Sequence, residues 1–205
     1  LSREIWFTAI FVGLTIVMVV LIYARAQNKS AINGLAAAAA LVGLIDVFFM
    51  AAIYSSSSVP FWQSAATYVE FYAAAISMGA ILFLLLSINE MAEMAIMKKI
   101  VALAVAVAVI LQVAVVVPSL IVMSASSSTA VHSSLAILGN MAVAIALKWI
   151  FILTGALLLL WMLKDELSKL VTNIVLSSTV LLLAGQIVGR YLFYAAMVVT
   201  GIGLS

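Results

Sequence analysis

The sequence predicts an all-α protein, a polytopic transmembrane helix bundle with six spans. Of its 205 residues, 68% are hydrophobic and only 8% are charged, whereas soluble domains carry about 25% charged residues. The mean hydropathy of +1.38 agrees with this composition. The apolar residues also fall into six long stretches that short polar connectors separate. These observations indicate an integral membrane protein.

Each of the six stretches reaches the roughly 20 apolar residues that a membrane-spanning helix needs. The predicted spans are residues 5–24, 31–53, 67–89, 98–123, 141–163 and 171–200. Pro118 lies inside the fourth span, where it predicts a kink. None of the connectors is long enough for a soluble domain, so we expect residues 1–205 to form a single transmembrane domain.

The basic residues of the connectors predict the orientation of the chain. The first, third and fifth connectors contain Arg25, Lys29, Lys98, Lys99, Lys164 and Lys169, and the second and fourth contain no charge. Because cytoplasmic loops of membrane proteins are enriched in lysine and arginine, the odd-numbered connectors are expected to face the cytoplasm. The prediction is a multi-pass protein of the cytoplasmic (inner) membrane, with both termini of this chain outside.

Given this orientation, the ionisable residues within and beside the spans lie on the outer side. They are Arg3, Glu4, Asp46, Glu70, His132, Lys148 and Arg190. Arg3 and Lys148 lie near helix ends, where long side chains can reach the headgroups. Asp46 and Arg190 lie deeper, where a charge is costly unless it is paired.

The last span carries polar residues on one face. Gln186, Arg190 and Tyr194 follow i, i+4, i+8 spacing and therefore share a helix face, while Gly185 and Gly189 permit a close neighbour. We expect this face to look inward. A buried arginine needs an anion and hydrogen-bond acceptors around it. The carboxylates at a suitable predicted depth are Glu4, Asp46 and Glu70.

These outer groups predict a site for a ligand with polar ends and an apolar body, and a quinol fits that description. Each hydroxyl of a quinol needs a hydrogen-bond partner and a proton acceptor. The candidate binding residues are His132, Arg190, Tyr194, Glu4, Asp46 and Glu70. His132 suits proton transfer near neutral pH, although an interfacial histidine bonded to a loop carbonyl is the alternative. Tyr194 is equally consistent with an aromatic belt at the interface.

A transporter or channel with a polar site on the outer side is the alternative function. Transporter sites are expected near the midplane of the membrane, on broken helices in corresponding halves of the chain. No such paired breaks are evident in this sequence.

Composition argues against several other classes of function. With no cysteine, the chain cannot ligate an iron–sulfur cluster through thiolates. A low-spin b haem commonly needs two axial histidines, and the chain has only His132, so we expect no haem. The scattered basic residues do not form the patch that nucleic-acid binding requires.

Four stretches resemble the membrane-anchor subunit of dimethyl sulfoxide reductase. They are "LSREI" at 1–5, "YSSSSVPFW" at 54–62, "HSS" at 132–134 and "LLLAGQIVGRYLFYAAMVVTGIG" at 181–203. The resemblance implies a haem-free anchor that oxidises menaquinol near the outer face. It also implies partners: an iron–sulfur electron-transfer subunit, a molybdopterin catalytic subunit and membrane lipid. This chain would then be a subunit of an oxidoreductase complex.

Members of that family have eight spans, and the resemblance begins at what would be the third. The first two spans, which include a histidine-containing stretch that the family associates with quinol binding, would therefore precede this sequence. The chain also opens without a methionine, so we expect it to continue a longer gene product or to follow processing.

The sequence departs from the family pattern at three places. Gln186 stands where a glutamate is usual, which removes a proton acceptor, and Ala136 and Ile137 replace a glutamine pair. The pair Lys148-Trp149 replaces Trp-Arg. Glu4 matches the family motif "LSREI", but a glutamate at this position also favours the positive end of a helix. The uncharged 54–62 loop is expected to be interfacial or to dock the iron–sulfur subunit.

The predicted orientation can be tested by cysteine labelling, because the chain has no native cysteine. In intact cells, a membrane-impermeant thiol reagent should label Ser56→Cys and should not label Lys99→Cys. Labelling with the reverse pattern would refute the orientation.

Overall fold

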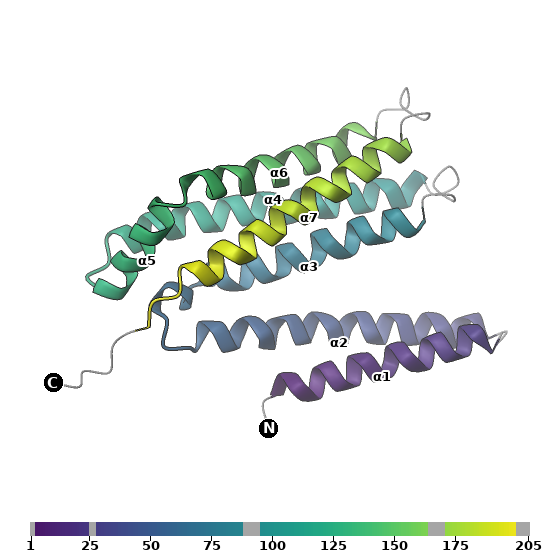
Figure 1. Cartoon of the computed structure of the whole chain (residues 1–205). Helices are drawn as coiled ribbons and strands as arrows, with labels where there is room; N and C mark the ends of the chain where they lie inside the picture. The colour runs from purple at the N-terminus through teal and green to yellow at the C-terminus, as the bar shows by residue number, and fades with distance from the viewer. Residues whose placement is uncertain (1–2, 25–27, 88–94, 164–170, 200–205) are drawn as a thin grey trace. The chain divides into compact units, whose positions relative to one another are not determined.

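The computed structural model describes residues 3–24, 28–87, 95–163 and 171–199, and these residues are all-helical, with no strand. In chain order the elements are α1 (Arg3–Tyr23), α2 (Lys29–Ser55), the 3₁₀ turn η1 (Pro60–Trp62), α3 (Ala65–Leu86), α4 (Ala95–Ser124), α5 (Thr129–Gly139), α6 (Ala142–Trp161) and α7 (Val171–Ala195). Figure 1 shows these elements along the chain. The predicted fold class is confirmed.

Six of the helices, α1, α2, α3, α4, α6 and α7, are long and apolar enough to cross a membrane. Their bounds match the six predicted spans to within a few residues, and a helix satisfies most of its backbone groups internally, as a bilayer demands. Pro118 lies inside α4, as predicted.

The short helix α5 was not expected. The serine-rich composition of residues 124–134 predicts a polar connector, but Thr129–Gly139 is helical. The reason is an apolar stripe among the serines, because the buried residues Ala130, Val131, Ser134 and Leu138 recur at helical spacing. With 11 residues, α5 is too short to span the membrane.

The chain consists of two compact units, Leu1–Tyr54 and Ser55–Ser205. The prediction of one domain over residues 1–205 stays a prediction. In the first unit, Phe7 of α1 stacks on Phe49 of α2 with ring centroids 4.9 Å apart. The Thr8 hydroxyl donates to both carboxylate oxygens of Asp46 at 3.0 Å. These contacts join α1 to α2.

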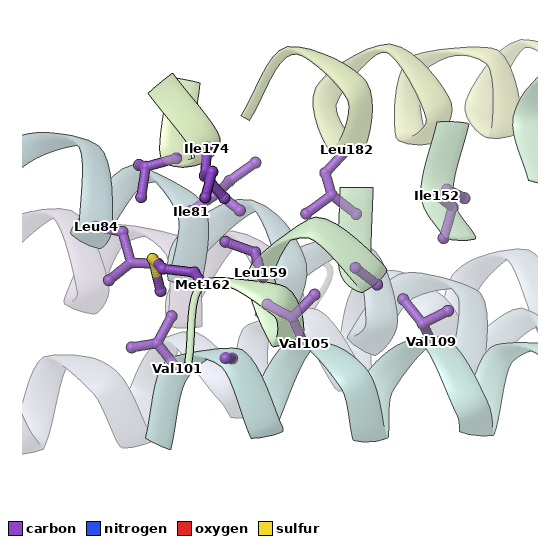
Figure 2. Close-up of a cluster of buried hydrophobic side chains, with 13 residues drawn as sticks. Ile81, Leu84, Val101, Val105, Val109, Ile152, Leu159, Met162, Ile174 and Leu182 are labelled. Atoms are coloured by element: carbon purple, nitrogen blue, oxygen red, sulfur yellow. The ribbon is translucent and has the colours of Figure 1, made fainter. Parts of the chain in front are cut away.

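In the second unit, α3, α4, α6 and α7 pack around one hydrophobic core. Figure 2 shows its side chains converging from the four helices, among them Ile81, Val105, Leu159 and Leu182. This core lies toward the ends of the helices that the orientation prediction assigns to the cytoplasmic side. This half of the unit is therefore closely packed and mostly apolar, although Ser178 and Thr179 are also buried there.

Glycines bring α6 and α7 close together. A Cβ atom added at Gly155 would lie 2.7 Å from Cγ of Leu182, and one added at Gly185 would lie 2.6 Å from Cγ1 of Ile152. Real Cβ atoms do not approach other atoms so closely, so only glycine fits at these positions. Small residues serve the same purpose in other membrane helix pairs, where van der Waals packing drives association.

We predict that Gly155→Leu destabilises the protein, because the new side chain overlaps Leu182. Overpacking of this kind costs about 1–3 kcal/mol, which should appear as a lower Tm of the purified protein in detergent. Gly79→Leu is the matched control, since a Cβ atom at Gly79 of α3 meets nothing within 4 Å. Equal Tm values for the two variants would contradict the close packing of α6 on α7.

Candidate functional site

An ion pair between α3 and α6 lies in the half of the second unit opposite the hydrophobic core. Lys148 Nζ donates to Glu70 Oε1 at 2.7 Å, and the two side chains are only 8% and 15% exposed. Charges withdrawn from water in this way persist when they are paired at short distance. The pair thus joins the start of α6 to the start of α3.

The helix α7 makes room for the lysine. A Cβ atom added at Gly189 would lie 3.1 Å from Cε and 3.6 Å from Nζ of Lys148, so the lysine stem crosses α7 at this glycine. The ammonium group also lies 4.8 Å from the ring centroid of Trp149, a distance typical of a cation–π contact. Three helices and one indole ring therefore fix the position of the ammonium group.

The ion pair forms part of the wall of a pocket with a cavity volume of about 100 Å³. The pocket is lined by Phe61, Ser64, Ala66, Thr67, Glu70, Val116, Ser119, Leu120, Met123, Leu138, Ile145, Lys148, Trp149, Gly189, Leu192 and Phe193. These residues come from η1 and from all five helices of the second unit. The wall is mostly apolar.

Two hydroxyl groups of the pocket wall are occupied by nearby carbonyls. The Thr67 hydroxyl donates to the Trp62 carbonyl at 2.6 Å, and the Ser119 hydroxyl donates to the Val115 carbonyl at 2.7 Å. The carboxylate and ammonium of the ion pair are thus the charged groups that the described part of the pocket presents to a ligand. This arrangement suits an apolar molecule with a polar group at one end.

Arg190 lies beside the pocket, among aromatic rings. Its guanidinium carbon is 3.7 Å from the ring centroid of Phe71 and 5.9 Å from that of Phe193. Such contacts stabilise a cation most strongly where water is excluded. Because Phe193 lines the pocket, Arg190 borders the pocket through this ring.

The indole of Trp62 fastens η1 to the end of α7. Its Nε1 donates to the Phe193 carbonyl at 3.0 Å, and its ring stacks on Phe193 with centroids 4.9 Å apart. Tyr194 meets Trp62 edge-on at 6.3 Å but is 48% exposed. The three polar residues on the α7 face that was predicted to look inward differ in burial. Gln186 is buried, Arg190 is half-buried and Tyr194 is exposed.

His132 lies on α5 with an exposed side chain, and its Nε2 is 2.7 Å from the Ser126 carbonyl oxygen. This is the loop-carbonyl contact that the sequence analysis kept as the alternative. His132 is not among the residues that line the pocket. The structure therefore does not bring it to the ion pair.

Glu4 and Asp46 belong to the first unit. Asp46 is 9% exposed and accepts hydrogen bonds from Thr8, and Glu4 lies in the first turn of α1. Glu70, the third candidate partner of Arg190, forms its ion pair with Lys148. A site shared by Arg190 with Glu4 or Asp46 involves both units and stays a prediction.

The sequence matches the model of a known protein family. The family model of the DMSO reductase anchor subunit (DmsC) matches residues 1–196. The chain belongs to the DmsC family. No curated protein and no solved structure matches this anchor subunit. Within the described ranges, no three His, Cys, Asp or Glu side chains are grouped to hold a metal ion.

The candidate site residues predicted from the sequence of this DmsC-family chain do not include Lys148, which lines the pocket. Its position near a helix end is equally consistent with an interfacial lysine, yet the structure buries its side chain against Glu70 and Gly189. A signal was present in the sequence, since a lysine and a glutamate lay at similar predicted depth on different helices. Equal depth alone does not say which faces of two helices meet.

The ion pair predicts a strong energetic coupling. Lys148→Met leaves the Glu70 carboxylate buried without its partner, which should cost about 3–5 kcal/mol of stability. Adding Glu70→Gln should recover much of this loss, because no buried charge then remains. Denaturant unfolding of the two single variants and the double variant measures the coupling. Additive effects would show that the pair contributes no coupling energy.

Proposed function

We propose that this chain is a haem-free membrane anchor that binds menaquinol near the outer face, oxidises it and passes the electrons to an iron–sulfur subunit. That subunit would in turn pass the electrons to a molybdopterin catalytic subunit. Membership of the DmsC family supports the role of anchor. The observation that carries the proposal is the Glu70–Lys148 pair on the wall of an otherwise apolar pocket.

The chemistry of the pair suits the head group of a quinol. Oxidation of a quinol to a quinone breaks two O–H bonds, and two electrons and two protons leave. The Glu70 carboxylate is the proton acceptor for one hydroxyl, and the Lys148 ammonium carries three N–H donors that can hold the oxygen as it loses its proton. The proton of the other hydroxyl passes to water at the outer rim of the pocket. The electrons leave to the partner subunit, so this chain provides binding, orientation and proton transfer.

The position of the pocket supports oxidation near the outer face. The pocket is lined by η1, α5, the first turns of α3 and α6 and the last turns of α4 and α7. Figure 1 shows these ends of the second unit together. The predicted orientation assigns all of them to the outer side of the inner membrane, opposite Lys98 and Lys99.

Other candidate residues take supporting roles in this proposal. Arg190 positions Phe193 in the pocket wall and adds positive charge beside it. His132 and Tyr194 lie at the same end, where they can accept or donate protons at the rim. Glu4 and Asp46, which belong to the first unit, stay predicted site residues. The η1 turn and the 54–62 loop are the proposed docking surface of the iron–sulfur subunit.

The spanning helices favour an anchor over a transporter. All six spanning helices are continuous: α1, α2, α3, α4, α6 and α7. Many transporter sites, in contrast, are built on discontinuous helices. Pro118 interrupts the hydrogen-bond ladder of α4 alone. A substrate-translocation path has less support than a quinol site.

The proposal predicts a selective loss of quinol oxidation in two variants of the assembled complex. Glu70→Gln removes the proton acceptor, so menaquinol-driven turnover should fall by about 100-fold. Arg190→Leu removes the positive charge beside the pocket, so menaquinol-driven turnover should also fall below that of the wild type. An artificial donor that reduces the catalytic subunit directly should still support full turnover.

Lys99→Gln, at the opposite end of the second unit, is the control and should behave as wild type. Intact Glu70→Gln and Arg190→Leu complexes that oxidise menaquinol at the wild-type rate would refute the site. Solute flux in vesicles that contain this chain without partners, altered by the same variants, would favour the transporter instead.

A further inference from the structure

Two buried glutamines in the second unit have side-chain amides without hydrogen-bond partners among the described residues. Gln112 on α4 is fully buried, and both its Oε1 and its Nε2 lack a partner. Gln186 on α7 is 3% exposed, and its Nε2 lacks a partner. Polar groups buried without hydrogen bonds are costly, and they are usually satisfied by ordered water or a ligand.

Both glutamines lie one helical turn inward from the pocket. Gln112 precedes the pocket residue Val116 by four positions on the same face of α4, which is about 6 Å along the helix axis. Gln186 precedes Gly189 by three positions, or about 4.5 Å. By helix spacing, each of the two amides therefore lies about one turn from the pocket wall, toward the hydrophobic core.

Two buried serines also have hydroxyls without hydrogen-bond partners, but these hydroxyls can be satisfied within their own helices. The two serines are Ser77 and Ser178, and the half-buried Ser64, which lines the pocket, also has a hydroxyl without a partner. A serine or threonine in a helix can turn its hydroxyl to the carbonyl four residues earlier, as Ser134 and Thr179 do. A buried glutamine amide has two donors and two acceptor sites to satisfy, so the glutamines need an external partner more than the serines do.

We propose that Gln112 and Gln186 bind water molecules beneath the pocket, and that this water exchanges protons with Glu70 during quinol oxidation. The inference rests on the proposed function. A quinol hydroxyl gives its proton to a Glu70 carboxylate oxygen, and the proton then moves from that carboxyl group to the bound water. This returns Glu70 to the carboxylate form that pairs with Lys148.

The core of the second unit closes the inner side of this water site. Val105, Leu159 and Leu182 are fully buried and lie further inward on α4, α6 and α7. The side chains of these three residues carry no group that can accept a proton. In this proposal the water is thus a transient proton acceptor, and the proton returns to the outer side through the pocket after the quinone has left.

The first test is a high-resolution cryo-electron microscopy map of the assembled complex. It should show ordered water density about 2.7–3.2 Å from the Gln112 amide atoms. A map at that resolution with well-defined Gln112 and Gln186 side chains but no such density would overturn the proposal, as would side-chain density that fills the site.

The second test is Gln112→Leu in the same complex. Replacing an unsatisfied amide by an apolar group of similar size should leave the Tm unchanged or raise it. Menaquinol-driven turnover should fall by about tenfold, less than the loss of a direct acid–base group, while turnover with an artificial donor is unchanged. Ser178→Ala is the matched control and should keep wild-type turnover with both donors.

The outcomes separate this inference from the function on which it rests. An intact Gln112→Leu complex that oxidises menaquinol at the wild-type rate overturns the role of the water and leaves the quinol site standing. A wild-type complex that oxidises no menaquinol overturns the proposed function and the proton role together, and the map then decides whether the water site itself exists.

Discussion

The Glu70–Lys148 ion pair is the interaction on which the arrangement of the second unit depends. It joins α3 to α6 through a 2.7 Å contact, and Lys148 reaches Glu70 because α7 has a glycine at position 189 where the lysine stem crosses. In a membrane, either charge alone would be costly. Helix packing and charge pairing therefore require each other, and the pocket forms where they meet.

The second unit divides into two halves of different chemistry. The half with the pocket holds the ion pair, Arg190 and the buried amides of Gln112 and Gln186, while the other half is an apolar core packed through glycines. Arg190 raised the question of how an arginine survives in an apolar helix. Part of the answer is the ring of Phe71, 3.7 Å from its guanidinium carbon.

Hydropathy and length predicted the six spanning helices, because a bilayer imposes both on any helix that crosses it. The same reasoning missed α5, whose apolar stripe is diluted by serines. It also placed Glu70 and Lys148 on one side of the membrane but did not pair them. The sequence indicates the depth of a residue in the membrane. Pairing depends instead on how each helix is rotated about its own axis, and the packing at Gly185 and Gly189 determines this rotation. The local contact of His132 with Ser126 likewise depends on a loop conformation.

The central claim is that the pocket beside the Glu70–Lys148 pair receives the quinol head group. Photolabelling of the assembled complex with an azido-quinone, followed by peptide mass spectrometry, tests this claim most directly. The account predicts label on the pocket segments around Thr67–Glu70 and Lys148-Trp149, and excess menaquinol should suppress it. Label that is confined to surfaces away from the pocket, or that menaquinol does not displace, would contradict the account.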